Sequence, residues 1–225
     1  MNGMSRAWMM RLVLASLASL ASLLSLIVFG GVAQAAEPAS AIAPIVAEVR
    51  SRMVDAAVLR GDFEQRKTLK GFKNQIISRG DFLVSRERGV IWHTREPFAS
   101  SVVVTKDRLT TRAADGSVTS RVTTKDEPGM QMVNETLFAL VAADLRVLAQ
   151  RFYLEGEVQG KDAWRLVLTP RDAALAQAIT RIELEGDRYL RSVRLVEAQG
   201  DVSFIRFSQQ TASPALTADE ERRFD

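Results

Sequence analysis

The spacing of apolar residues along this chain changes from helical to alternating soon after its N-terminal region. Between positions 43 and 56, Ile45, Val46, Val49 and Met53 recur at helical spacing and predict one amphipathic helix. From Val58 onward, apolar and polar residues alternate, which is typical of strands with one buried face. Gly, Asp and Pro residues interrupt these runs at hairpin spacing, so we expect antiparallel strands joined in sequence.

The clearest hairpin lies between positions 80 and 97, where two short apolar runs flank a charged turn. Alternate residues of a strand share a face. The apolar face is therefore formed by Phe82 and Val84 on one strand and by Val90 and Trp92 on the next. Arg86 continues the same alternation into the turn, which places an arginine at the rim of an apolar surface.

Eleven strands and two further helices follow from the same reasoning. The strands are expected at 59–67, 75–85, 89–94, 100–105, 108–113, 117–123, 152–158, 164–169, 181–185, 189–197 and 202–209. A helix over 134–148, capped by Asn134, is apolar nearly all round and should be buried. Asp172 can cap a short helix over 173–179, and the tail from Thr211 is polar. The predicted fold class is mainly β with α, a curved antiparallel sheet that wraps around helices on one side.

The N-terminal residues have the features of a secretory signal peptide. Arg6 and Arg11 precede an uncharged apolar stretch over 12–32, and Ala33-Gln34-Ala35 is a suitable cleavage site. We expect residues 1–35 to be removed, which leaves one domain over 36–225 in the periplasm. The alternative is a membrane anchor, because the apolar stretch is long.

Composition argues against several kinds of function. The 30 basic and 27 acidic residues nearly balance, and no basic block interleaved with aromatics indicates nucleic-acid binding. The chain has no cysteine and a single histidine, His93, so we expect no disulfide and no metal site built on His or Cys ligands. No Walker loop, dinucleotide fingerprint or nucleophile elbow is present. We therefore expect a protein without catalytic residues or cofactors.

The positive signal is a set of large apolar side chains that could line a cavity. A strongly curved sheet covered by a helix can enclose space for a ligand, and acyl chains are the natural occupants in a periplasmic protein. The candidate lining residues are Phe63, Phe82, Val84, Val90, Trp92, Leu137, Leu140, Val141 and Trp164. The alternative is that these residues are an ordinary core.

Several short motifs resemble, in order, those of the LolA-type periplasmic carriers, which move lipoproteins from the inner to the outer membrane. The motifs are Gly61-x-Phe63-x-Gln65, Gly80-Asp81-Phe82-x-Val84-x-Arg86, Trp92 with Pro97, Leu168-Thr169-Pro170, and Gly200 with Ile205-x-Phe207. The resemblance implies an incomplete barrel of about eleven strands, with helices as a lid over an apolar cavity for acyl chains. It also implies that Arg86 latches the lid, here 134–148, through hydrogen bonds. Arg88 is a possible substitute for Arg86.

The partners implied by the resemblance are an acylated lipoprotein or other lipid cargo, a releasing complex in the inner membrane and an acceptor in the outer membrane, and we expect a monomer. The chain departs from the family where Glu87 replaces a proline and where 106–111 lacks aromatic residues. The stretch 97–100 is closer to LolA-like proteins of aryl-polyene and glycolipid pathways. Two alternatives to lipoprotein transport therefore remain, namely a carrier of another lipid and a regulatory module that binds lipid or peptide without carrying it.

Overall fold

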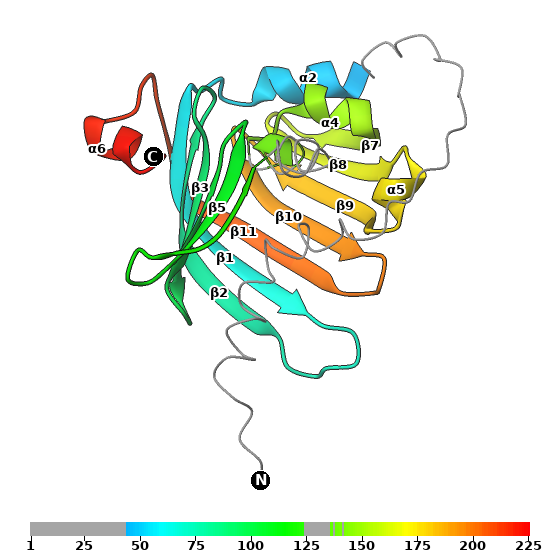
Figure 1. The fold of residues 1–225 in the computed structure, drawn as a ribbon. Helices are drawn as coiled ribbons and strands as arrows, with labels where there is room; N and C mark the ends of the chain where they lie inside the picture. The colour runs from blue at the N-terminus through cyan, green and yellow to red at the C-terminus, as the bar shows by residue number, and fades with distance from the viewer. Residues whose placement is uncertain (1–43, 124–135, 137, 141) are drawn as a thin grey trace, which may run out of the picture.

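The computed structural model describes residues 44–123, 136, 138–140 and 142–225. Within these residues, eleven antiparallel strands form a single curved sheet (Figure 1). The strands are β1 Val58–Thr68, β2 Ile76–Ser85, β3 Gly89–Glu96, β4 Ser100–Val104, β5 Arg108–Ala113, β6 Val118–Thr123, β7 Phe152–Gln159, β8 Ala163–Pro170, β9 Ile179–Gly186, β10 Leu190–Glu197 and β11 Val202–Ser213. The predicted fold class and all eleven strands are thus confirmed, with shifts of a few residues at their ends.

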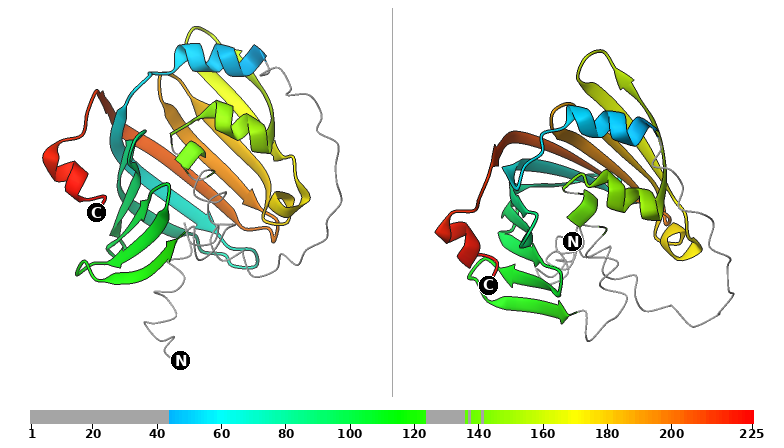
Figure 2. Two further views of the ribbon diagram at one scale, coloured as in Figure 1. Left: turned by 45° about the horizontal axis from the view of Figure 1, so that its top comes forward. Right: turned by 90° about the horizontal axis from the view of Figure 1, so that it is seen from above.

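The sheet is joined in its middle by the first and last strands. The strand order is β6-β5-β4-β3-β2-β1-β11-β10-β9-β8-β7. The first strand, β1, therefore pairs with the last strand, β11, although the other nine strands lie between them in sequence. In this pairing Phe63 lies opposite Phe207. The ends of the order, β6 and β7, curl toward each other without pairing, and the sheet is therefore an open barrel (Figure 2).

Two helices lie within the curve of the sheet, on the side that we call the inner face. They are α2, Pro44–Arg52, and α4, Leu145–Arg151. Val46 and Val49 of α2 and Leu145 and Leu148 of α4 are fully buried in the main hydrophobic core. None of the helices in the described part of the chain is long and apolar enough to cross a bilayer.

The expectation of one continuous helix over 134–148 is wrong. Residues 138–140 are helical, but Ala143 adopts a left-handed backbone with φ 49° and ends this turn. Asp144 then caps α4, and its side chain accepts hydrogen bonds from the backbone N–H groups of Arg146 and Val147. Asn134, the expected cap, lies outside the described residues, as does the proposed signal peptide over 1–35. The short helix after Asp172 is confirmed as α5, Ala173–Ala176, with Asp172 as its cap.

A fourth helix, α6, Ala218–Arg222, packs on the opposite side of the sheet, the outer face (Figure 1). The expectation of helices on one side only was therefore wrong, and the polar tail contains this helix. Phe224 is only 1% exposed and packs in a second core with Val58, Leu83, Ile91 and Val103. A single aromatic residue at the end of a polar segment gives no periodic pattern, which is why the sequence did not reveal this element.

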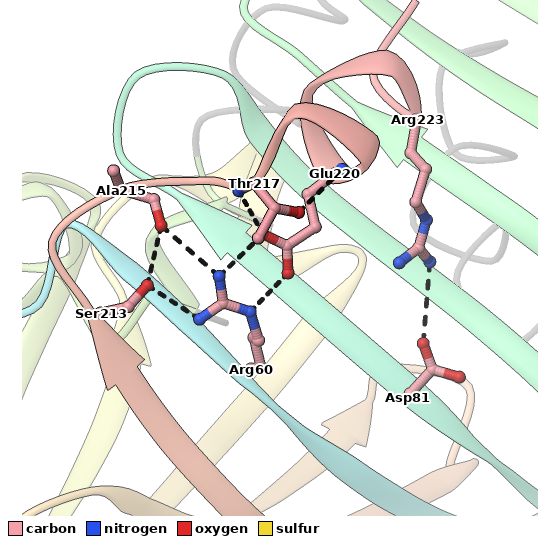
Figure 3. A network of polar contacts seen from close by, with 7 residues as sticks. All are labelled: Arg60, Asp81, Ser213, Ala215, Thr217, Glu220 and Arg223. Carbon is pink, nitrogen blue, oxygen red and sulfur yellow. Dashed lines mark hydrogen bonds and ion pairs between the residues drawn. The ribbon is translucent and has the colours of Figure 1, made fainter.

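Polar contacts fix α6 to the sheet (Figure 3). Thr217 and Glu220 form a capping box at its N-terminus. Arg60 of β1 donates to Glu220 Oε2 at 2.7 Å and to Ser213 Oγ at 2.8 Å. Arg60 and the backbone N–H of Thr217 lower the pKa of Glu220 to about 2, so this carboxylate stays charged beside the arginine.

Candidate functional site

Four aromatic rings form the centre of the inner face. Phe63 stacks on Trp92 with ring centroids 3.8 Å apart, and Phe207 meets Phe82 edge-on at 5.2 Å and Trp92 at 6.1 Å. All four side chains are buried. Stacked and edge-on pairs of this kind stabilise a core beyond the area that they bury.

Two glycines make room for these rings. Phe63 of β1 lies opposite Gly80 of β2, and Gly61 lies opposite Phe82. A Cβ on Gly80 would clash with the carbonyl oxygen of His93 and lie 2.8 Å from the Phe63 ring. A Cβ on Gly61 would likewise lie 2.8 Å from the Phe82 ring. The Gly-x-Phe motifs of the two strands therefore work together, since the ring of each phenylalanine lies against the glycine of the neighbouring strand.

The structure places most of the predicted lining residues in one cluster. Phe63, Phe82, Val84, Val90, Trp92, Leu140 and Trp164 are all buried members of the main hydrophobic core. Leu137 and Val141 lie outside the described residues. Trp164 belongs to the other half of the sheet, where its indole N–H donates to the Asp187 carbonyl oxygen at 2.7 Å. Phe207 was missed as a lining residue, although its alternation with Ile205 was a usable signal.

A cleft opens at the mouth of this interior, between α2 and the described residues 138–140 and 142–146. It encloses about 690 Å³, and its walls include Met53, Phe138, Ala142 and Arg86. A second, smaller cavity of about 50 Å³ shares Met53, Ala142 and Arg86 with it. This inner cavity also touches Leu59, Val84 and Leu190, so a path from solvent to the inner face passes Arg86.

Arg86 lies at the mouth, as the sequence predicted, and its ion-pair partner in the described part of the chain is Asp55. Asp55 follows α2, so the pair ties the β2–β3 turn to the segment that leaves this helix. The hydrogen bond and charge of Arg86 lower the pKa of Asp55, and the charges of Arg50 and Arg146 add to this effect. Arg86 is 56% exposed, so water and ions reach the pair and weaken it.

Arg88, the alternative to Arg86, points elsewhere. Its guanidinium donates to Asp225 at 2.7 Å and lies 5.8 Å from the centroid of the Phe224 ring. Both contacts are with the C-terminal segment on the outer face. The two arginines of one turn are thus directed to opposite sides of the sheet, and Arg86 is the one at the mouth.

The far end of the inner face carries a buried ion pair that the sequence did not suggest. Lys67 of β1 donates to Glu197 of β10 at 2.8 Å, and both side chains are 6% exposed. Asp201 lies 3.8 Å from the same ammonium, and Gln65 and Ser203 are buried nearby on β1 and β11. An apolar ligand would therefore meet a polar layer at this end, which limits how far it could extend.

His93 faces the outer side of the sheet. Its Nδ1 lies 2.9 Å from Asp81 Oδ1. Among the residues that the structure describes, no group of three or more His, Asp or Glu side chains is arranged to hold a metal ion.

Comparisons with known proteins identify the family of the chain. The family described as "Outer membrane lipoprotein carrier protein LolA" matches residues 55–220. No curated protein matches the sequence. Solved structures with a similar fold include the LolA superfamily protein NE2245 from Nitrosomonas europaea, with 11% identity, a TM-score of 0.42, and coverage of 83% of this chain and 98% of that one.

Two other solved structures are similar to the same extent. One is an outer membrane lipoprotein-sorting protein domain from Vibrio parahaemolyticus, with 10% identity, a TM-score of 0.43, and coverage of 80% and 97%. The other is a DUF1329 family protein from Desulfovibrio piger, with 10% identity, a TM-score of 0.42, and coverage of 80% and 94%. Because the family match spans most of the chain and includes every strand, this protein belongs to the LolA family of outer membrane lipoprotein carrier proteins.

Proposed function

We propose that this protein is a periplasmic carrier that shields the acyl chains of lipoproteins from water between the inner and outer membranes. The observation that carries the proposal is the apolar inner face of an open sheet, reached through a cleft beside Arg86. Each CH₂ group removed from water gains roughly 0.8 kcal/mol, so an acyl chain of about sixteen carbons gains on the order of 10 kcal/mol. That gain is large enough to keep the chain inside the carrier and out of water between the two membranes.

Loading requires the inner face to open, because its side chains now fill it. Phe63 and Trp92 are in stacking contact, and Leu140 packs into the same cluster. The elements that would move are α2 and the described residues 138–140 and 142–146, which contribute to the two walls of the cleft. The exposed Arg86–Asp55 pair ties the segment that follows α2 to the β2–β3 turn, and we assign it the role of a weak latch.

The carrier role is tested by identifying what the protein holds. The full-length chain, with its own leader, is expressed in a double-membrane bacterium, and protein purified from the periplasm is analysed by native mass spectrometry. Adducts with the mass of triacylated or diacylated proteins support lipoprotein cargo. Small hydrophobic adducts would indicate that the cargo is another lipid and not a lipoprotein. A stoichiometric protein partner without any lipid would contradict a carrier role and indicate a regulatory module.

The latch is tested by Arg86→Leu, with Arg88→Leu as the matched control from the same turn. Loss of the arginine makes the mouth more apolar, so Arg86→Leu should still load cargo and release it more slowly to acceptor vesicles. Arg88→Leu should release at the parent rate, because Arg88 faces the other side. Equal release by all three proteins would refute the latch while leaving the carrier role intact.

The expected periplasmic location has its own test. N-terminal sequencing of the protein from the periplasmic fraction should begin at Ala36, in agreement with the cleavage site. An uncleaved protein that sediments with membranes would show an anchor instead.

A further inference from the structure

Another cavity, which we call the outer cavity, lies on the outer face of the sheet, on the opposite side from the cleft and the inner cavity. Its floor follows one row of cross-strand neighbours, because Asp81 pairs with His93, His93 with Ser101, and Ser101 with Arg112. These residues come from four successive strands, β2 to β5. The sheet register therefore brings an imidazole, a hydroxyl and a guanidinium into one line.

The end of α6 forms the other wall. The adjoining row of the sheet, with Ile91 and Val103, is buried under Phe224, and Arg222 and Arg223 extend from there over the polar row. Figure 3 shows Arg223 reaching down toward Asp81, at a distance of 3.7 Å. The space between them is open to solvent and has a volume of about 580 Å³, which is within the range of small-molecule sites.

The lining of this cavity is cationic. Arg112, Arg222 and Arg223 contribute three guanidinium groups, and among the described residues of the lining Asp81 is the one carboxylate. Asp81 is already engaged, because His93 Nδ1 lies at 2.9 Å, and Arg95 on the same strand as His93 lies at 3.9 Å. Arg222 also has a partner outside the lining, Asp219.

Arg112 is different from the other two arginines. It is half-buried on β5, and no ion pair or hydrogen bond of its side chain is found within the described residues. A partly desolvated guanidinium gains from a bound anion more than an exposed one does, since water competes less for it. Ser101, beside it in the row, can add a neutral donor.

We propose that this outer cavity binds a phosphate group, held by Arg112 with Ser101 below and by the arginines of α6 above. A phosphate presents several acceptor oxygens in different directions, which suits donors that arrive from two elements. The phosphate could belong to a soluble metabolite or to the headgroup of a phospholipid, and both would enter from the open side. The site lies on the opposite face from the acyl interior and does not depend on the carrier role.

The experiment is a titration of the mature chain with inorganic phosphate and with glycerol 3-phosphate, followed by amide resonances in ¹H–¹⁵N NMR spectra. Saturable shifts should centre on Ser101 and Arg112, and Arg112→Gln should weaken the affinity about tenfold, as expected for loss of a charge-assisted hydrogen bond. The control is Arg121→Gln, which removes an equal charge from the neighbouring strand β6 and lies outside the cavity. It should bind like the parent.

A flotation assay distinguishes the two sources of phosphate. Binding to phosphatidylglycerol vesicles but not to phosphatidylcholine vesicles, with loss in Arg112→Gln alone, would identify a lipid headgroup. Saturable binding of the soluble phosphates without vesicle binding would identify a soluble ligand. The absence of saturable shifts, or an equal weakening in both variants, would overturn the proposal, because the second result reflects net charge only. Thermal melting of each variant shows that it is folded.

Discussion

Replacement of Phe224 by alanine should release α6 from the outer face. Phe224 is the largest side chain of the second core and is 1% exposed, between Leu83, Ile91 and Val103. The helix itself has only five residues and no buried side chain of its own. A helix this short is not stable without tertiary contacts, so its position depends on the aromatic ring that follows it.

The size of the effect follows from this burial. Fully buried phenylalanine residues lose about 3–5 kcal/mol when truncated to alanine. The C-terminal segment is free to adjust, so we expect the lower end of this range, about 3 kcal/mol of the free energy of unfolding. For a domain of this size, 1 kcal/mol corresponds to a shift of roughly 2–4 °C in Tm, so the melting temperature should fall by about 6–12 °C.

Urea denaturation followed by tryptophan fluorescence measures the loss in the free energy of unfolding of the whole domain. Amide hydrogen exchange over 218–222 measures the loss of protection in α6. The matched control is Phe72→Ala, because Phe72 is 62% exposed in the β1–β2 connection and should change stability by less than about 0.5 kcal/mol. If Phe224→Ala kept the urea midpoint of the parent and full protection of α6, the claim that Phe224 anchors the helix would be refuted. The polar contacts of Arg60 and Arg108 would then be what holds the helix.

Three further predictions concern other contacts. The pKa of Glu220 is lowered to about 2, so its contribution is fully present above about pH 4.5 and is lost as the pH falls toward 2; protection of α6 in hydrogen exchange should fall in this window, and Glu220→Gln should remove that pH dependence. Gly80→Ala should destabilise the protein by about 3 kcal/mol or more in urea, since its Cβ would clash with the His93 carbonyl, and an unchanged midpoint would contradict the close approach of the strands. Lys67→Met should cost about 3–5 kcal/mol because it removes the cation beside the buried Glu197 carboxylate, which keeps a hydrogen bond from the Gln199 side chain, whereas Lys67→Met with Glu197→Leu should recover most of the loss; a double variant as unstable as the single one would refute the pairing argument.

The sequence alone determined the strands and the faces of their side chains. Alternation is a local property, because each residue along a strand points to the side opposite its neighbours. Phe82, Val84, Val90 and Trp92 therefore could be assigned to one face without any knowledge of the sheet, and the structure buries all four in the same core. The cap at Asp172 was predictable for the same reason, since it depends on residues three positions apart.

The helix over 134–148 shows where local patterns are insufficient. Its apolar spacing continues through Ala143, but the chain turns there with a positive φ and begins a new helix at Asp144. Burial of Leu145 and Leu148 against the inner face offsets the conformational strain at Ala143. This burial depends on the rest of the fold, so the local sequence pattern does not reveal it.

Only the tertiary structure decided which distant segments meet. The pairing of β1 with β11 brings Phe207 to Phe82, places Lys67 beside Glu197 across the neighbouring strand, and carries the chain end to the outer face, where Phe224 anchors α6. The β1–β2 pairing, in which Val58 lies opposite Ser85, brings Arg86 to Asp55 at the mouth, and the chain end brings Asp225 to Arg88 on the outer face. Such contacts form between residues far apart in the chain. The alternation of a strand shows that one of its faces is buried, but it does not show which other segment packs against that face.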